Sequence, residues 1–289
     1  MAERTSILVT GIARNVAKII PKELKRIEKE LDKIFEIVFF LVIESDSKDN
    51  TKQVLHDTKN KKSNFDYKSL GKIESILPNR IERLAFCRNT YVKEIRENEL
   101  YKDLDFIAVV DFDIKNNRLN LGGLKKLINE NSWSAIFANQ TGFYYDIYAL
   151  RKKGWVESDC FDEYKKFSIN MSPLDAKELA IWSKMKKIKK NLPLMPVNSA
   201  FGGLGIYRKN IFMNFDYSFP PEQLHESEHV SLHRKIIDSN GLLFIAPNIT
   251  NFSWSAHNLS SFKLFRMLDQ ALNRKSLKII RSFARKLLS

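Results

Sequence analysis

Apolar runs alternate with segments of helical spacing through the first half of the chain. The runs at residues 6–10, 36–43, 106–110 and 133–138 predict strands. Apolar residues recur every three or four positions at residues 21–35, 79–100 and 121–131, which predicts helices, and a short helix is expected from about Asn50. This alternation indicates an α/β fold with a mostly parallel sheet flanked by helices. Strands that are apolar throughout fit a sheet covered on both faces.

The second half is more mixed. Residues 143–150 and 242–246 predict strands, residues 172–190 predict a lysine-rich helix, and residues 225–238 predict another helix. Gly202 and Gly203 separate two apolar segments, and residues 58–72 are expected to form an exposed loop. From residue 260 the chain predicts a basic, amphipathic helix. We therefore expect an α/β domain over residues 1–258 and a helical tail over residues 259–289.

Composition agrees with a globular domain. Hydrophobic residues make up 44% of the 289 positions, enough to build a sizeable core. No apolar run reaches the roughly 18–20 residues needed to cross a bilayer, and the N-terminus shows no signal peptide. With two cysteines, Cys87 and Cys160, there is no basis for a disulfide framework. A reducing compartment follows, and the expected location is the cytoplasm.

The net charge of +14 indicates an anionic partner, unless it only reflects a lysine-rich composition. Candidate partners are nucleotide phosphates, a membrane surface that carries lipid-linked acceptors, and nucleic acid. The sequence lacks the interleaved basic and aromatic motif of a known nucleic-acid-binding module, so nucleic acid is not the expected partner. The basic tail fits either a helix packed on the domain or peripheral attachment to the inner face of an anionic membrane.

An acidic pair follows one of the predicted strands. Asp111 and Asp113 flank Phe112 directly after residues 106–110. Carboxylates two positions apart on an extended backbone point the same way and can jointly hold Mg²⁺ or Mn²⁺. Such a cation would neutralise a diphosphate and assist its departure. Aspartate is also common where strands end, so it is the position of the pair in an α/β half that favours a metal site.

The order of the polar motifs resembles GT-A-type glycosyltransferases. The motifs are Thr10-Gly11-Ile12-Ala13-Arg14-Asn15, Glu44-Ser45-Asp46-Ser47, Arg83-Leu84-Ala85-Phe86-Cys87-Arg88-Asn89, Asp111-Phe112-Asp113, Ala200-Phe201-Gly202-Gly203 and Glu226-Ser227-Glu228-His229-Val230. The segments around Arg88-Asn89 and Glu228-His229-Val230 further resemble the cryptococcal-type alpha-mannosyltransferase family and its bacterial and viral relatives. The resemblance covers roughly residues 5–258. It implies transfer of a hexose, mannose-like or rhamnose-like, from a UDP- or GDP-sugar to a glycan hydroxyl.

The resemblance also implies roles for individual residues. Nucleotide-sugar binding would fall to Thr10, Gly11, Ala13, Arg14, Glu44, Asp46, Arg83, Arg88, Asp111, Gly202 and Gly203. The metal would be held by Asp111, Asp113 and His257. Among these, the two arginines of the helical motif would approach the diphosphate, for which a guanidinium fork is suited. On a helix, however, charged residues are usually solvated, so Arg83 and Arg88 could instead be surface residues.

The catalytic base is the least determined role. Inverting relatives place an acidic pair after the glycine-rich turn, and this chain has Glu228-His229 there. A base that deprotonates an acceptor hydroxyl needs a tuned carboxylate or imidazole within reach. The order of candidates is Glu228, then Glu226, then His229.

A competing motif overlaps this segment. His225-Glu226-Ser227-Glu228-His229 matches H-E-x-x-H, which on one helix face would hold zinc with Glu226 as the base of a hydrolase. No glutamate follows Glu228 to serve as a third ligand, and the metzincin extension is missing, with Leu232 and Lys235 at its glycine and histidine positions. The zinc hydrolase is therefore kept as an alternative, as is a basic nucleic-acid-binding protein.

Overall fold

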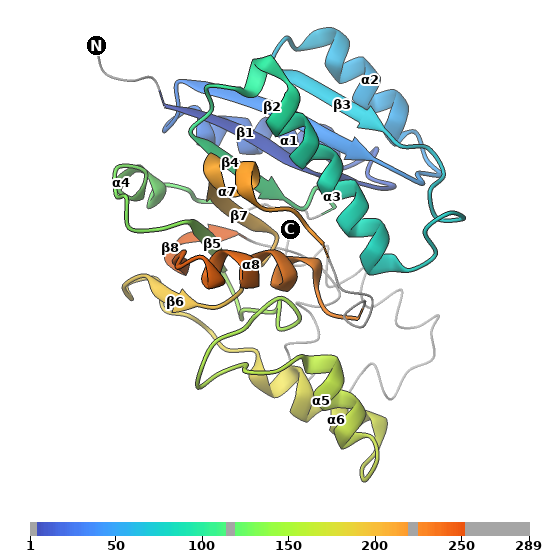
Figure 1. Cartoon of the computed structure of the whole chain (residues 1–289), viewed down its shortest axis with the longest axis vertical. Coiled ribbons are helices and arrows are strands. Elements are labelled where there is room, and N and C mark those ends of the chain that lie inside the picture. The colour runs from blue at the N-terminus through green and yellow to red at the C-terminus, as the bar shows by residue number, and fades with distance from the viewer. Residues whose placement is uncertain (1–4, 114–118, 219–224, 252–289) are drawn as a thin grey trace, which may run out of the picture.

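The computed structural model describes residues 5–113, 119–218 and 225–251, which form an eight-stranded sheet (Figure 1). The strand order is β3-β2-β1-β4-β7-β5-β8-β6. The strands are β1 (Ser6–Ala13), β2 (Ile37–Glu44), β3 (Phe65–Ser69), β4 (Phe106–Val110), β5 (Ala135–Gln140), β6 (Met195–Val197), β7 (Leu204–Arg208) and β8 (Leu243–Asn251). β7 runs antiparallel to β4 and β5, and β6 runs antiparallel to β8, while the other pairs are parallel. The predicted α/β class with a mostly parallel sheet is confirmed.

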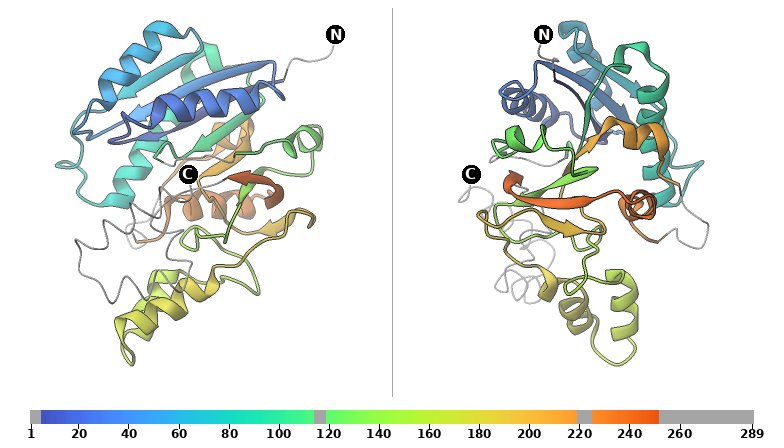
Figure 2. Two further views of the ribbon diagram at one scale, coloured as in Figure 1. Left: turned by 180° about the vertical axis from the view of Figure 1, so that it is seen from behind. Right: turned by 60° about the vertical axis from the view of Figure 1, so that its left-hand side comes forward.

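Helices cover both faces of this sheet (Figure 2). They are α1 (Ile20–Leu31), α2 (Thr51–Lys61), α3 (Arg80–Glu97), α4 (Leu124–Leu127), α7 (Lys209–Asn214) and α8 (Glu228–Asp238), with a short 3-10 turn, η1 (Glu99–Tyr101), after α3. Apolar residues of α1, α2 and α4 build the core on one face, and those of α3, α7 and α8 build the core on the other. Because both faces are covered, β1 and β4 are buried along their whole length but for Ile12, which is half-buried.

Between β5 and β6 the chain leaves the sheet and forms a helical hairpin. It contains α5 (Cys160–Phe167), α6 (Pro173–Ala180) and η2 (Trp182–Lys184), and it projects beyond the sheet edge (Figure 1). Asp159 caps α5 by accepting hydrogen bonds from the backbone N–H groups of Phe161 and Asp162. We call residues 151–192 the α5–α6 lobe.

Two predicted segments are wrong in type. Residues 58–72 are not one loop, because α2 continues to Lys61 and residues 65–69 form the edge strand β3. Residues 143–150 are not a strand. They make one isolated bridge, Phe143 with Lys187, although Tyr144, Ile147 and Leu150 are buried in the core. Their apolar character reflects burial in a packed loop, which periodicity does not distinguish from a short buried strand.

Three predicted helices are longer than the observed ones. The helix expected at 121–131 is regular only over α4, the one expected at 172–190 ends at Ala180, and the one expected at 225–238 begins at Glu228. His257 and the tail over residues 259–289 lie outside the described residues. Across the part of the chain that is described, no helix is both long enough and apolar enough to span a membrane.

Candidate functional site

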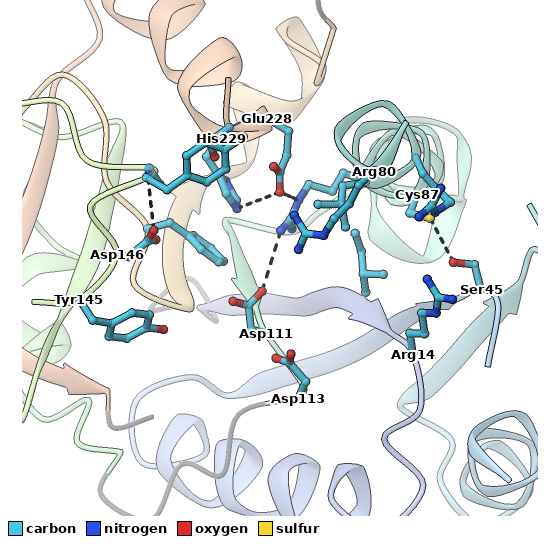
Figure 3. Close-up of a pocket in the computed structure, with 18 residues that line it drawn as sticks. Arg14, Ser45, Arg80, Cys87, Asp111, Asp113, Tyr145, Asp146, Glu228 and His229 are labelled. Carbon is cyan, nitrogen blue, oxygen red and sulfur yellow. Dashed lines mark hydrogen bonds and ion pairs between the residues drawn. The ribbon is translucent and has the colours of Figure 1, made fainter. Parts of the chain in front are cut away.

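A cavity of about 490 Å³ opens where the parallel strands end, and charged side chains line it (Figure 3). Four arginines and four carboxylates lie in its wall: Arg14, Arg80, Arg83, Arg88, Asp111, Asp113, Asp146 and Glu228. They come from the end of β1, from α3, from the turn after β4, from the loop after β5 and from the first turn of α8. Ligands in open α/β sheets bind at this carboxyl edge, because the strand ends bring loops distant in sequence together.

The acidic pair lies in this cavity, as its position after β4 predicts. The backbone N–H of Asp111 donates to the carbonyl of Gly203 (3.0 Å), which fixes the turn after β4 against the glycine pair. About a third of the Asp111 side chain (35%) is exposed. Burial raises the pKa of Asp111 to about 7, the charges of Asp113, Asp146 and Glu228 act in the same direction, and Arg88 opposes them. The four carboxylates in this part of the wall thus carry more negative charge than the nearby guanidinium of Arg88 can offset.

This donor set fits a divalent cation of the Mn²⁺ or Mg²⁺ kind. Carboxylate oxygens are the ligands such ions prefer, and a cation would relieve the repulsion between Asp111 and Asp113. The described residues contain no group of three or more His, Cys, Asp or Glu side chains arranged around one point. Mg²⁺ is commonly bound by one or two carboxylates together with waters and substrate phosphates. Asp111 and Asp113 therefore provide enough protein ligands of the right type.

Arg88 lies at the centre of a buried ion network. Its Nε donates to Oε1 of Glu228 (2.9 Å), and an Nη atom lies 3.9 Å from Oδ1 of Asp111. The guanidinium also lies near two aromatic rings, with its carbon 5.5 Å from the Phe201 ring centre and 5.6 Å from that of Tyr217. Arg88 is 4% exposed. Its contacts thus connect Glu228 and Asp111 with the aromatic side chains beside the cavity.

His229 follows Glu228 on α8 and extends the aromatic stack. Its ring lies parallel to Phe201 at a centroid distance of 3.8 Å, and its Nε2 is 3.8 Å from Glu228 Oε1. Burial, followed by the charge of Arg88, lowers the pKa of His229 well below its usual value, so the imidazole is neutral. His233, one turn later, bonds Ser199 and Tyr207 (2.8 Å each) and has a pKa lowered by burial to about 3.

Two of the other arginines share one acidic partner. Arg14 pairs with Glu74 (2.7 Å), and Arg83 lies 3.4 Å from the same carboxylate while it donates to the carbonyls of Leu77 and Pro78. Arg80, in the first turn of α3, is exposed at the mouth of the cavity. Together they give the side of the cavity opposite Asp111 a positive character, as Figure 3 shows for Arg14 and Arg80.

Several predicted nucleotide-binding residues lie behind the cavity wall. Thr10, Gly11 and Ala13 are buried in β1. A Cβ at Gly11 would lie 2.1 Å from the carbonyl oxygen of Val110, so that glycine serves the contact between β1 and β4. Glu44 closes the turn after β2 by accepting from Ser47 N–H and Ser69 Oγ. In that turn Asp46 adopts a left-handed conformation (φ 56°), accepts from Glu74 N–H, and leaves Oδ2 buried without a partner.

The glycine pair positions two carboxylates of the cavity wall through backbone hydrogen bonds. Gly202 (φ 66°) and Gly203 (φ 82°) are both left-handed, a conformation that glycine adopts without strain. Gly202 donates its N–H to Asp146 (2.9 Å) and its carbonyl accepts from Gln140 and Asn251, while the Gly203 carbonyl holds Asp111. The pair connects two carboxylates of the cavity wall, and Phe201 beside it lines the cavity.

Asp146 and its aromatic neighbours were missed by sequence reasoning. Asp146, Tyr145 and Tyr148 line the cavity from residues 143–150, which were predicted as a strand. The signal that could have identified them is an acidic residue inside an otherwise aromatic run, Tyr144-Tyr145-Asp146-Ile147-Tyr148. Ser45 and Arg80 also belong to the wall and were not singled out.

The H-E-x-x-H motif does not form a zinc site. Ser227 caps α8, so His225 and Glu226 precede the helix and do not share its face with His229. His225 is exposed and lies 3.3 Å from Asp162, while Glu226 is paired with Arg234 (2.7 Å) and Arg151 (3.6 Å). The arrangement that the described residues adopt therefore does not favour the zinc hydrolase alternative.

Comparisons with known proteins agree with the fold. Protein-family models give no match, and curated protein sequences give none. Among solved structures, the mannosyltransferase PcManGT from Pyrobaculum calidifontis, in complex with GDP-Man and Mn²⁺, matches with a TM-score of 0.52 at 11% identity, over 100% of this chain and 66% of that one. S. aureus TarS 1-349 matches with a TM-score of 0.49 at 14% identity, over 86% of this chain and 60% of that one.

The chain thus shares the α/β fold of PcManGT. It spans 60–66% of the length of these two structures. The narrower resemblance to the cryptococcal-type family stays a prediction.

Proposed function

We propose that the protein is a metal-dependent glycosyltransferase that moves a hexose from a nucleotide diphosphate sugar to a hydroxyl group. The observation that carries the proposal is the acidic pair Asp111 and Asp113, which leaves a buried strand and enters a cavity whose opposite side is lined by arginines. The donor is a UDP- or GDP-sugar, and the hexose is mannose-like or rhamnose-like. The acceptor is a glycan or a lipid-linked glycan. The shared fold supports this proposal, because PcManGT itself was solved with GDP-Man and Mn²⁺.

The metal role falls to Asp113 and Asp111, with His257 as a further candidate ligand. A bound Mn²⁺ or Mg²⁺ would neutralise the diphosphate and stabilise it as a leaving group. Arg14 and Arg83 are oriented by Glu74, and with Arg80 they offer guanidinium groups to phosphate oxygens. Ser45 and the turn that holds Asp46 lie at the same end of the cavity and would take the nucleoside.

Glu228 is the proposed base. It lines the cavity and accepts a hydrogen bond from Arg88 (2.9 Å), which fixes its position, and a carboxylate can accept a proton from an acceptor hydroxyl. Glu226 is held by two arginines outside the cavity lining, and both ring nitrogens of His229 are buried without a partner. His229 also lines the cavity, but its neutral ring stacks on Phe201 beside Glu228, so we place it after Glu228 as a candidate base.

A panel of UDP- and GDP-sugars tests the proposal. With Mn²⁺ present and a glycan acceptor, we expect release of the nucleoside diphosphate from one donor, and loss of release on addition of a chelator. Asp113→Asn should reduce the rate by about 10²-fold or more, because charge stabilisation of the leaving group is lost. Asp57→Asn on the exposed face of α2 is the matched control. Turnover that is equal with and without metal, or equal in Asp113→Asn, would contradict the proposal.

A further inference from the structure

The α5–α6 lobe exposes an unusual share of large apolar side chains. Of the ten large hydrophobic residues that are exposed in the described chain, five lie in this lobe: Phe161, Ile169, Leu174, Leu179 and Leu192. Ile169, in the turn between α5 and α6, is 78% exposed. Helix α6 packs inward through Ala176 and Ala180, so its leucines are not used by the protein's own core. Apolar side chains gathered on one projecting element indicate a surface that meets a partner.

Positive charge accompanies these side chains. Residues 151–192 contain eleven lysines and arginines against six acidic residues. Five of the lysines fall between residues 184 and 190, where Met185 and Ile188 are buried and Lys186, Lys187, Lys189 and Lys190 are exposed. Two of the six acids are already neutralised within the lobe, because Asp159 pairs with Arg151 and Glu163 pairs with Lys184.

We propose that the α5–α6 lobe is a docking surface for an anionic lipid bilayer. Exposed aliphatic side chains would enter the boundary between headgroups and acyl chains, while the exposed lysines of the same lobe would attract anionic headgroups. A second copy of the chain fits less well, because a two-fold contact would place this basic surface against itself. Nucleic acid fits less well too, because bases stack on aromatic rings and four of the five exposed apolar residues here, all but Phe161, are aliphatic.

The lobe is joined directly to the candidate site. Tyr148 of the cavity wall packs edge-on against Phe161 at the start of α5 (5.1 Å between ring centres), and its hydroxyl donates to the carbonyl of His225. His225 in turn lies against Asp162 of α5. A lobe docked on a bilayer therefore holds the cavity beside the membrane surface. This step rests on the proposed function. If the cavity lies beside a membrane, the hydroxyl that accepts the sugar belongs to a membrane-anchored molecule.

Co-sedimentation of the full chain with vesicles tests the surface without any catalytic assay. We expect binding to phosphatidylcholine vesicles that contain 30% phosphatidylglycerol, little binding to phosphatidylcholine alone, and weakening at high salt. Ile169→Glu/Leu174→Glu should weaken binding about tenfold or more, because two insertions are lost. Lys189→Glu/Lys190→Glu should weaken binding to the anionic vesicles only. Leu100→Glu, at an exposed apolar site on η1 outside the lobe (53% exposed), is the control and should bind as the parent chain does.

Each other outcome overturns the proposal. If the parent chain does not bind anionic vesicles, neither the lobe nor the tail at residues 259–289 is a docking surface for them. If the double variants bind as well as the parent while remaining folded by circular dichroism, the lobe is not the docking surface and the tail becomes the candidate. If the variants lose binding to a single-stranded RNA and the parent ignores vesicles, the lobe serves a nucleic acid. Because vesicle binding needs no sugar transfer, its failure is distinct from a failure of the proposed activity.

Discussion

At the scale of single residues, Arg88 differs most from what its sequence context implies. The family resemblance assigns it to the donor diphosphate, whereas in the structure its Nε donates to Glu228 and its guanidinium lies near the rings of Phe201 and Tyr217. We therefore expect Arg88 to position Glu228 as well as to line the cavity. Sequence reasoning could identify Arg88 as functional but not its role, because the partner that decides the role lies 140 residues away.

This arrangement predicts a specific pattern of stability. Arg88→Gln leaves Glu228 buried without its counter-charge, which should lower the free energy of unfolding by about 3–5 kcal/mol. The double variant Arg88→Gln/Glu228→Gln removes both charges and should lose clearly less than the sum of the two single losses. Denaturant unfolding of the four proteins measures the cycle. Additive losses would show that the pair does not interact across the network.

Substitution of Arg88 should affect nucleotide binding and turnover differently. Arg88→Lys should leave the Kd for UDP or GDP with Mn²⁺ within about threefold, yet lower kcat by about 10²-fold, because the base is displaced. Arg14→Gln should do the opposite and weaken nucleotide binding. Calorimetric titration and initial rates together decide the matter, and a large loss of nucleotide affinity in Arg88→Lys would return that residue to the diphosphate.

Asp111 gives the site a pH dependence that can be measured without substrate. Its pKa is raised to about 7 by burial and by neighbouring carboxylates, so below pH 7 a cation must displace a proton from it. The rise in Tm caused by Mn²⁺ should therefore be larger at pH 8 than at pH 6. In Asp111→Asn the shift should be smaller and nearly independent of pH. A Tm shift in the parent protein that does not change between these two pH values would contradict this account of the carboxylate.

At the scale of elements, buried strands were predicted best. Residues 106–110 form β4 as expected, since a strand covered on both faces is apolar throughout. β3 was missed because it is an edge strand, in which Phe65 is buried beside the polar Asp66 and Lys68. Residues 143–150 were read as a strand because a loop that packs into a core is as apolar as a strand. Because of that error Asp146 was not predicted as a site residue, so only part of the acidic wall could be predicted from the sequence.

The turn that carries the glycine pair offers a matched test of positioning. A Cβ at Gly202 would meet Gln140 Nε2 at 2.8 Å, whereas Gly71, with a similar φ of 70°, has open space around it. Gly71→Ala should lose about 1 kcal/mol for the left-handed backbone alone. Gly202→Ala should lose about 2–4 kcal/mol in unfolding experiments, since a clash adds to the same strain. It should also weaken Mn²⁺ binding, because the neighbouring Gly203 carbonyl holds Asp111. Equal effects of both substitutions would show that only the backbone conformation matters.

At the scale of the whole molecule, the cavity is lined by residues that range from Ile12 to His229 in the sequence, and its walls carry charges of opposite sign. Asp111, Asp113, Asp146 and Glu228 form an acidic wall, and Arg14, Arg80 and Arg83 form a basic one. A nucleoside diphosphate alone would be attracted by the arginines and repelled by the carboxylates, because like charges at short range in a partly buried site interact strongly. A divalent cation at the acidic wall would turn that repulsion into attraction.

The two ligands should therefore bind cooperatively. A ligand that binds only the folded state adds RT ln(1 + [L]/Kd) to stability, about 2.7 kcal/mol at a hundredfold excess over Kd. We expect Mn²⁺ and GDP or UDP together to raise Tm by clearly more than the sum of their separate shifts, since each increases the affinity for the other. In Asp113→Asn the shifts should become additive, because the cation no longer offsets the acidic wall. Asp57→Asn should keep the cooperativity. Additive shifts in the parent protein would mean that the cation and the nucleotide occupy separate places, and the acidic wall would then need another explanation than a shared diphosphate site.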